Sequence, residues 1–245
     1  MLEARGLTKW YGGVLAVSEV NFTVPAGQVL GYLGPNGSGK STTVGMLAGL
    51  IEPTSGAVFF SGADIAEDSI DFRRHVGYVP EEPDLYPFLS GREHLDLVAQ
   101  LRDMDAGVAT RRTTALLDLF GLGHHADAPL SSYSKGMRQK ILLSAALLHD
   151  PAVLIFDEPV SGLDATSAVV FRHLLEELAG RGKAVLYCSH ELDEVEKTCS
   201  RVLVLHRGRV VAHDSVGRLR ETLAQASLEA VFQQLVAASD PARIA

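Results

Sequence analysis

The sequence has little of several features that would assign it to a particular class of protein. Its 245 residues contain only two cysteines, which are too few for a disulfide framework and fit a reducing cytosol. No run of about 18 apolar residues occurs, so no segment is expected to span a membrane by itself. The N-terminus lacks the apolar centre of a signal peptide. Any work at a membrane would therefore need a partner that holds the chain there.

The balance of charge excludes a second class. The formal net charge is −8 at pH 7, and a protein whose main partner is a nucleic-acid backbone needs a basic surface. We therefore expect no nucleic-acid partner, although a nucleotide could still bind locally. The apolar fraction of 47% and the charged fraction of 21% are near average, which predicts a globular chain with a buried core.

A phosphate-binding loop is the strongest feature that is present. Residues 34–42 match the pattern G-x-x-x-x-G-K-[ST] at every fixed position. Glycines let many backbone N–H groups converge on one anion, and the helix that follows directs its positive end at it. An apolar strand over 28–33 and a helix over 41–50 supply the required context. The residues expected to bind ATP here are Gly34, Pro35, Asn36, Gly37, Ser38, Gly39, Lys40, Ser41 and Thr42.

Polar residues follow two further apolar segments. Asp157 and Glu158 come after the strand 153–156, and His190 follows the strand 184–188. In open α/β sheets, ligands bind outside the carboxyl ends of the strands, so these groups should converge on the phosphate loop. Asp157 is placed to hold magnesium and Glu158 to act as general base, while Lys40 and His190 would contact the outer phosphates. The competing interpretation of the two acids is a capped strand end.

The remaining pattern predicts an α/β fold with a parallel sheet, a small antiparallel β subdomain and an all-helical insert subdomain. The antiparallel sheet would come from strands within residues 2–33 and a hairpin near 56–62. The insert covers about 85–150. Its three helices are expected from a capping box at Ser90 to about Arg102, from about 108 to 120, and from about 135 to 148. Further helices are expected over 165–179, 192–198 and the tail 216–238, with a closing hairpin over 202–211.

Two weaker signals concern the nucleotide. Tyr11 could stack on a base without reading its identity, although the spacing alone favours a packing aromatic. Ser134 can cap the third helix of the insert, and Gly136 allows close approach, so Ser134, Lys135, Gly136 and Met137 form a second anion-binding helix start. Alone this is weak evidence, because every helix has an N-terminus.

Taken together, these residues resemble the nucleotide-binding subunit of an ABC transporter, over roughly residues 2–236. The resemblance implies that 34–42 is the Walker A loop, that Asp157 and Glu158 are the Walker B pair, and that His190 is the switch histidine. It also implies a D-loop over 161–164 containing Asp164, a signature loop at Ser134–Met137, and Tyr11 as the base-stacking aromatic. The family implies ATP and Mg²⁺ as cofactors, with the metal held by Ser41, Glu81 and Asp157. The domain would cover 1–236, followed by a C-terminal tail at 237–245.

The departures from the family pattern are informative. The usual signature is Leu-Ser-Gly-Gly-Gln, whereas Tyr133, Lys135 and Met137 stand here at three of the five positions. Glu81 stands where glutamine is usual. Both changes look like the branch of export-type subunits that pair with separate membrane proteins. We hypothesise that Lys135 offsets the negative charge of Glu81 across a dimer.

These inferences predict the cytoplasmic ATPase subunit of an exporter. It would lie on the cytoplasmic face of the cell membrane and bind an integral membrane permease. The family implies a head-to-tail dimer in which the signature loop of one subunit caps ATP held by the other. The loop 80–89 would transmit the motion to the permease. The rivals are an ABC ATPase that works without a membrane partner, on ribosomes or DNA, and a small-molecule kinase that uses the same phosphate loop. The exported substrate is not encoded in this chain.

Overall fold

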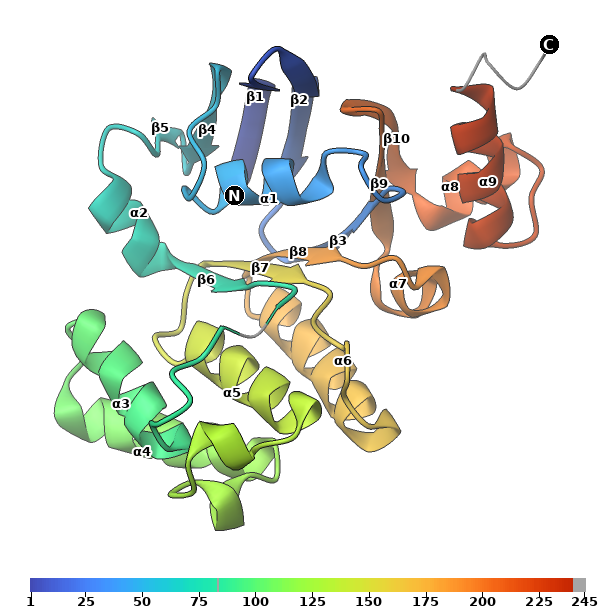
Figure 1. Ribbon diagram of the computed structural model, residues 1–245. Helices are drawn as coiled ribbons and strands as arrows, with labels where there is room; N and C mark the ends of the chain where they lie inside the picture. The colour runs from blue at the N-terminus through green and yellow to red at the C-terminus, as the bar shows by residue number, and fades with distance from the viewer. Residues whose placement is uncertain (83, 240–245) are drawn as a thin grey trace.

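Two sheets form the frame of the molecule, as the computed structural model of residues 1–82 and 84–239 shows (Figure 1). The smaller sheet is antiparallel, with the strand order β2-β1-β4-β5. Its strands are β1 (Leu2–Tyr11), β2 (Val14–Val24), β4 (Ser55–Phe60) and β5 (Ala63–Asp64). The antiparallel subdomain and the β4–β5 hairpin predicted from the alternating pattern are thereby confirmed.

The larger sheet carries the strand ends that matter for function. Its order is β10-β9-β3-β8-β7-β6, and all neighbours except β9 and β10 run parallel. Both β7 and β8 are buried at every residue because each face of the sheet is covered, so they read as unbroken apolar runs. The strands are β3 (Gln28–Leu33), β6 (Val76–Val79), β7 (Val153–Asp157), β8 (Ala184–Cys188), β9 (Arg201–His206) and β10 (Arg209–Ser215).

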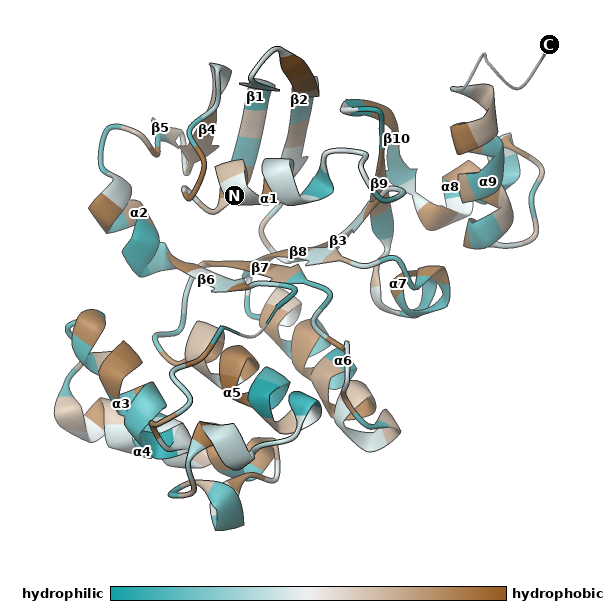
Figure 2. Cartoon of the chain, viewed as in Figure 1, coloured by the Kyte–Doolittle hydropathy of each residue, from teal (hydrophilic) through white to brown (hydrophobic). Residues whose placement is uncertain are grey.

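Successive residues of each central strand enter two different cores. Leu30, Ile155 and Leu186 pack on the side of α1 and the small sheet. Leu154 and Phe156 pack on the opposite side, against the other helices. Figure 2 shows hydrophobic residues running through the central strands and alternating with hydrophilic residues on α5 and α6. The alternation fixes the register of the strands and therefore which side chains stand at their carboxyl ends.

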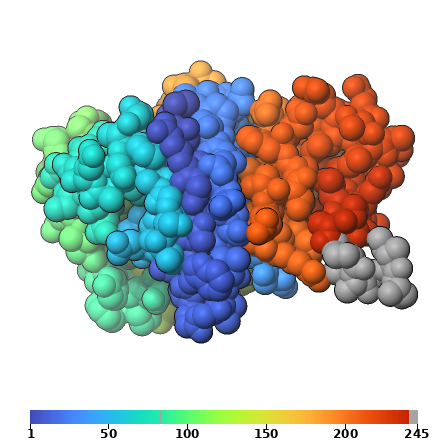
Figure 3. All heavy atoms as spheres, turned by 90° about the horizontal axis from the view of Figure 1, so that it is seen from above, coloured from blue at the N-terminus to red at the C-terminus, as the bar shows by residue number. Residues whose placement is uncertain are grey.

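The helices flank these sheets in three groups. Helix α1 lies between the two sheets; α3, α4 and α5 form the insert; and α7, α8 and α9 gather beside β9 and β10 (Figure 1). Viewed from above, the C-terminal part forms one end of the molecule and the insert the other (Figure 3). The helices are α1 (Lys40–Leu47), α2 (Ser69–His75), α3 (Gly91–Leu101), α4 (Ala106–Leu119), α5 (Lys135–Leu147), α6 (Ala165–Gly180), α7 (Leu192–Thr198), α8 (Val216–Thr222) and α9 (Leu228–Ala238).

Two of the predicted helices need correction, and one helix was not predicted. The tail is not one helix over 216–238, because the chain breaks between α8 and α9. Ala224 has a left-handed φ of 53°, and Ser227 starts a new helix by accepting a hydrogen bond from the N–H of Ala230. Helix α4 begins two residues earlier than predicted because Asp105 caps it. Helix α2, capped by Asp68, was not predicted.

The capping box of Ser90 and Glu93 opens α3 as predicted. Pro83 in the predicted loop 80–89 and residues 240–245 of the predicted tail lie outside the described residues. Within the described part of the chain, no helix is long and apolar enough to cross a membrane.

Candidate nucleotide site

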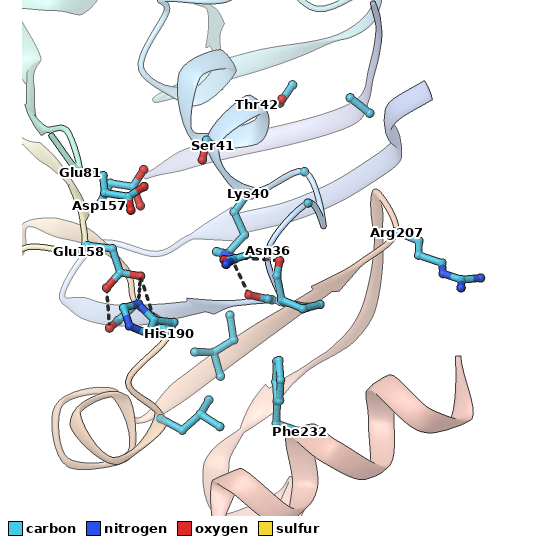
Figure 4. Close-up of a pocket in the computed structure, with 18 of the residues that line it drawn as sticks. Asn36, Lys40, Ser41, Thr42, Glu81, Asp157, Glu158, His190, Arg207 and Phe232 are labelled. Atoms are coloured by element: carbon cyan, nitrogen blue, oxygen red, sulfur yellow. Dashed lines mark hydrogen bonds and ion pairs between the residues drawn. The ribbon is translucent and has the colours of Figure 1, made fainter. Parts of the chain in front are cut away.

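A cavity of about 720 Å³ opens at the carboxyl ends of the central strands (Figure 4). The phosphate loop lines one side, and Glu81, Asp157, Glu158 and His190 line the other. The loop residues that line it are Gly34, Pro35, Asn36, Gly37, Gly39, Lys40, Ser41 and Thr42. Ser38 is buried behind them. The structure therefore brings together the groups that the sequence placed at three separate strand ends.

The phosphate loop depends on its glycines for shape. Gly39 has a φ of 99°, and a Cβ there would lie 2.6 Å from the carbonyl oxygen of Ala16. The N–H of Gly208 donates to the carbonyl of Ser38 at 2.8 Å, which ties the loop to the β9–β10 turn. Helix α1 starts at Lys40 with no side-chain cap. Its first N–H groups are therefore available to an anion at the positive end of the helix.

Lys40 places a cation within the phosphate loop. Its Nζ donates to the carbonyl of Gly34 at 2.6 Å and lies 3.3 Å from that of Pro35. The side chain is thus folded back over the loop, at the place where phosphate oxygens would be bound.

Asp157 supplies a buried acid at the end of β7. Its residue is 6% exposed, and burial raises the pKa of its carboxyl to about 6, with the negative charges of Glu81 and Glu158 adding to the effect. Lys40 opposes this shift. Figure 4 shows Asp157 and Glu81 side by side. The carboxylates concentrate negative charge at one point, which favours a cation there.

Two residues that follow β8 hold the carboxylate of Glu158 through three contacts. The hydroxyl of Ser189 donates to Oε2 at 3.1 Å, and the N–H of His190 donates to Oε1 at 2.8 Å. The ring Nδ1 of His190 lies 2.8 Å from the same Oε1. This hydrogen bond raises the pKa of His190 above its ordinary value, and the charge of Glu158 adds to the shift. Glu158 and His190 therefore form a hydrogen-bonded pair.

Several predicted residues lie elsewhere. Tyr11 is 46% exposed and is not among the lining residues, although Val14 and Leu15, just across its hairpin, are. The Nζ of Lys9 lies 5.3 Å from the centre of the Tyr11 ring. A base-stacking role for Tyr11 stays a prediction.

The predicted signature loop is also outside this chain's own cavity. Ser134 caps α5, accepting a hydrogen bond from the N–H of Met137, and Lys135 donates to the hydroxyl of Ser161 at 3.1 Å. Gly136 allows close approach because a Cβ there would meet the carbonyl oxygen of Gly162 at 2.4 Å. Asp164 caps α6 and pairs with Lys140 at 3.2 Å. In this chain, the signature loop therefore contacts the predicted D-loop, and its role toward ATP in a second subunit stays a prediction.

Some residues that line the cavity were not predicted from the sequence. Leu192, Arg207 and Phe232 all line the cavity. Leu192 follows His190 closely and could have been inferred from that proximity. Nothing local in the sequence identifies Arg207 or Phe232, because the fold brings them to the phosphate loop from far along the chain.

A comparison with protein families agrees with this geometry. A family model described as ABC transporter matches residues 17–161, which is more than half of the chain. The chain belongs to the ABC transporter family of ATP-binding proteins. Its phosphate loop and the pair Asp157 and Glu158 fall within the matched residues.

Individual ABC proteins resemble it over most of their length. The Nod factor export ATP-binding protein I of Burkholderia lata is 36% identical over 90% of this chain and 73% of its own. A solved structure of an ATP-binding subunit of an ABC transporter has a TM-score of 0.91 at 33% identity, covering 96% of this chain and 98% of that one. The dimeric cassette MJ0796, bound to ADP and Pi after hydrolysis, has a TM-score of 0.81 at 25% identity, covering 88% and 98%. The present chain is therefore an ABC-type ATPase with the α/β fold of these cassettes.

Proposed function

We propose that this ATPase powers export through a separate membrane permease, as a head-to-tail dimer at the cytoplasmic face of the membrane. The observation that carries the proposal is a cavity in which the phosphate loop meets three acids and a histidine. Export is supported by the relative named for Nod factor export, and dimer formation by the dimeric MJ0796 cassette.

ATP binding would rest on Lys40 and the start of α1. The phosphates would take the place of the carbonyl groups of Gly34 and Pro35 as partners of the Lys40 ammonium. The free N–H groups of α1 would donate to the same oxygens. Tyr11 would stack on the base from the edge of the cavity.

The residues around Asp157 fit Mg²⁺. The ion is commonly held by one or two carboxylates together with substrate phosphates, and Ser41, Glu81 and Asp157 offer hard oxygen donors in the same cavity. Within residues 1–82 and 84–239, no three acidic, histidine or cysteine side chains form a metal site of their own. When bound, Mg²⁺ would neutralise charge that develops on the phosphates.

Glu158 would act as the general base. Both carboxylate oxygens already accept hydrogen bonds from Ser189 and His190, so the side chain is held in one orientation. An attacking water would donate its proton to this carboxylate. His190 would keep Glu158 in place and hold the terminal phosphate on the other side.

A second subunit would complete the site. The signature loop at the start of α5 lies outside the cavity of its own chain and presents a helix start capped by Ser134. Such a helix end suits an anion supplied by another molecule. Ser134 and Gly136 would therefore cap ATP bound to the partner chain.

The loop before α3 is the proposed contact with the permease. Tyr86 and Phe88 are exposed, Phe88 by 74%, and their ring centres lie 5.8 Å apart. Exposed aromatic pairs of this kind are typical of protein interfaces. The loop runs from the cavity residue Glu81 to the insert, so it can report the nucleotide state.

The test replaces Tyr86 and Phe88 together with alanine. Copurification with an integral membrane protein and ATP-driven transport should be lost, while basal ATPase activity of the isolated subunit stays unchanged. Leu119→Ala, which removes another exposed apolar side chain, is the matched control. Unchanged transport in the double variant would contradict the proposed contact.

A further inference from the structure

Helix α7 connects the active site to the C-terminal helices. It begins at Leu192, two residues after His190, and Leu192 itself lines the nucleotide cavity. Any tilt of α7 would therefore move the backbone that places His190 against Glu158. Catalytic hydrogen bonds of this kind are sensitive to shifts of about 1 Å, which can cost up to about a hundredfold in rate. The contacts that hold α7 in place should therefore affect the rate of ATP hydrolysis.

One carboxylate on α7 joins it to both C-terminal helices. Oε1 of Glu196 accepts a hydrogen bond from Nη1 of Arg220 in α8 at 3.0 Å. Oε2 accepts from the N–H of Leu228, the first residue of α9, at 3.1 Å. The negative charge therefore lies at the positive end of α9, which adds to the attraction. On its other side α7 is tied to α6 by Arg172 and Glu194 at 3.0 Å.

The same C-terminal helix reaches the nucleotide cavity. Leu228 and Val231 of α9 are fully buried, and Phe232, on the same face at helical spacing, lines the cavity. Figure 4 shows the Phe232 side chain directed from α9 toward Asn36 of the phosphate loop. Leu33 and Leu192 also line this cavity. The hydrogen bond from Leu228 to Glu196 holds the start of α9 and should therefore also hold the ring of Phe232 in position.

We infer that the α8–α9 pair is a positioning element of the ATPase site, which sets α7 and His190 through Glu196 and closes the cavity wall through Phe232. The inference rests on the ATPase site of the proposed function and is independent of export and of the permease. Residues of α7, α8 and α9 lie beyond the segment 17–161 that matches the family model. The contacts that carry the inference are those of this chain's own side chains.

Four variants of the full chain separate the two parts of this inference. Glu196→Ala removes both acceptors and should lower kcat on the order of tenfold, with the KM for ATP changing less than about twofold. Glu196→Gln keeps only one of the two acceptors and turns an NH2 donor toward the other N–H group, so kcat should lie between that of Glu196→Ala and that of the wild type. Phe232→Ala should instead raise the KM for ATP by about threefold or more, because it opens the wall without moving α7. Gln233→Ala, on the exposed side of α9, should leave both constants unchanged.

The measurements are steady-state ATPase kinetics, together with the fraction of each sample that binds a fluorescent ATP analogue. Wild-type kcat in Glu196→Ala would overturn the positioning role. The positioning role would also be overturned if kcat fell only in proportion to the fraction of protein that binds the analogue, because such a fall reports loss of folded protein. An unchanged KM for ATP in Phe232→Ala would overturn the proposal that Phe232 closes the cavity wall. If the wild-type chain itself did not hydrolyse ATP, the proposed function would fail, and the analogue's affinity for Phe232→Ala would still test the wall.

Discussion

Replacing Asp157 with asparagine should stabilise the nucleotide-free protein while it abolishes ATP hydrolysis. The carboxyl is buried at the end of β7 and faces Glu81 and Glu158, with only Lys40 opposing them. Asparagine has nearly the same shape and carries no charge. The substitution therefore removes the repulsion, but it also removes the negative charge that would hold Mg²⁺.

The size of the effect follows from the pKa. In the folded chain the pKa of Asp157 is raised from 3.8 to about 6. At about 1.36 kcal/mol per pKa unit, keeping this carboxylate ionised in the folded state costs about 2 to 3 kcal/mol at neutral pH. For a chain of this size, relief of that cost should raise Tm by roughly 5 to 10 °C.

The dependence on pH has a definite sign. A carboxyl whose pKa is raised on folding favours the folded state only while it is protonated, so the penalty is absent below about pH 3.8 and complete above about pH 6. The difference in the free energy of unfolding between Asp157→Asn and wild type should therefore be full at pH 7.5. At pH 5 it should fall to about half.

The assay is urea or thermal unfolding of both proteins without nucleotide or metal, at pH 5, 6 and 7.5. Asp193→Asn, which alters an exposed carboxylate on α7, is the control and should change stability little at any of these pH values. An Asp157→Asn variant that is less stable than wild type at pH 7.5, or a gap that does not shrink at pH 5, would refute the reasoning.

Two further predictions concern ATP. Glu158→Gln should bind ATP with near wild-type affinity but reduce kcat by at least about a hundredfold, because it removes the proton acceptor; near wild-type turnover would remove Glu158 as the base. Tyr11→Ala should raise the KM for ATP several-fold, whereas Tyr11→Phe keeps the ring and should leave it near wild type. If the KM for ATP of Tyr11→Ala stays as low as that of Tyr11→Phe, Tyr11 is a packing residue and does not stack on the base.

Much of the site could be predicted because its parts are encoded locally. The phosphate loop is one continuous segment with a strand before it and a helix after it. Asp157 and Glu158, like His190, follow runs of buried residues that only a covered strand requires. Once the strands are parallel neighbours, their carboxyl ends must meet, so the convergence did not depend on knowing the details of packing.

The remainder depends on tertiary contacts. The break between α8 and α9 comes from a left-handed Ala224, and no glycine or proline marks it in the sequence. Phe232 lines the cavity from α9, whose first N–H group donates to Glu196 on another helix. Likewise, Lys135 contacts Ser161 of its own chain, a contact that sequence spacing does not reveal. Its proposed compensation of Glu81 in a second subunit stays a prediction.

In the proposed dimer, one chain holds half of a hydrolytic site and a second copy supplies the rest. The most direct measurement is the molar mass of Glu158→Gln by light scattering, with and without ATP, because this variant should hold ATP without consuming it. We predict a monomer that becomes a dimer when ATP is added, and no such shift when Ser134→Arg blocks the exposed helix start of α5. A chain that stays monomeric when saturated with ATP would contradict the claim.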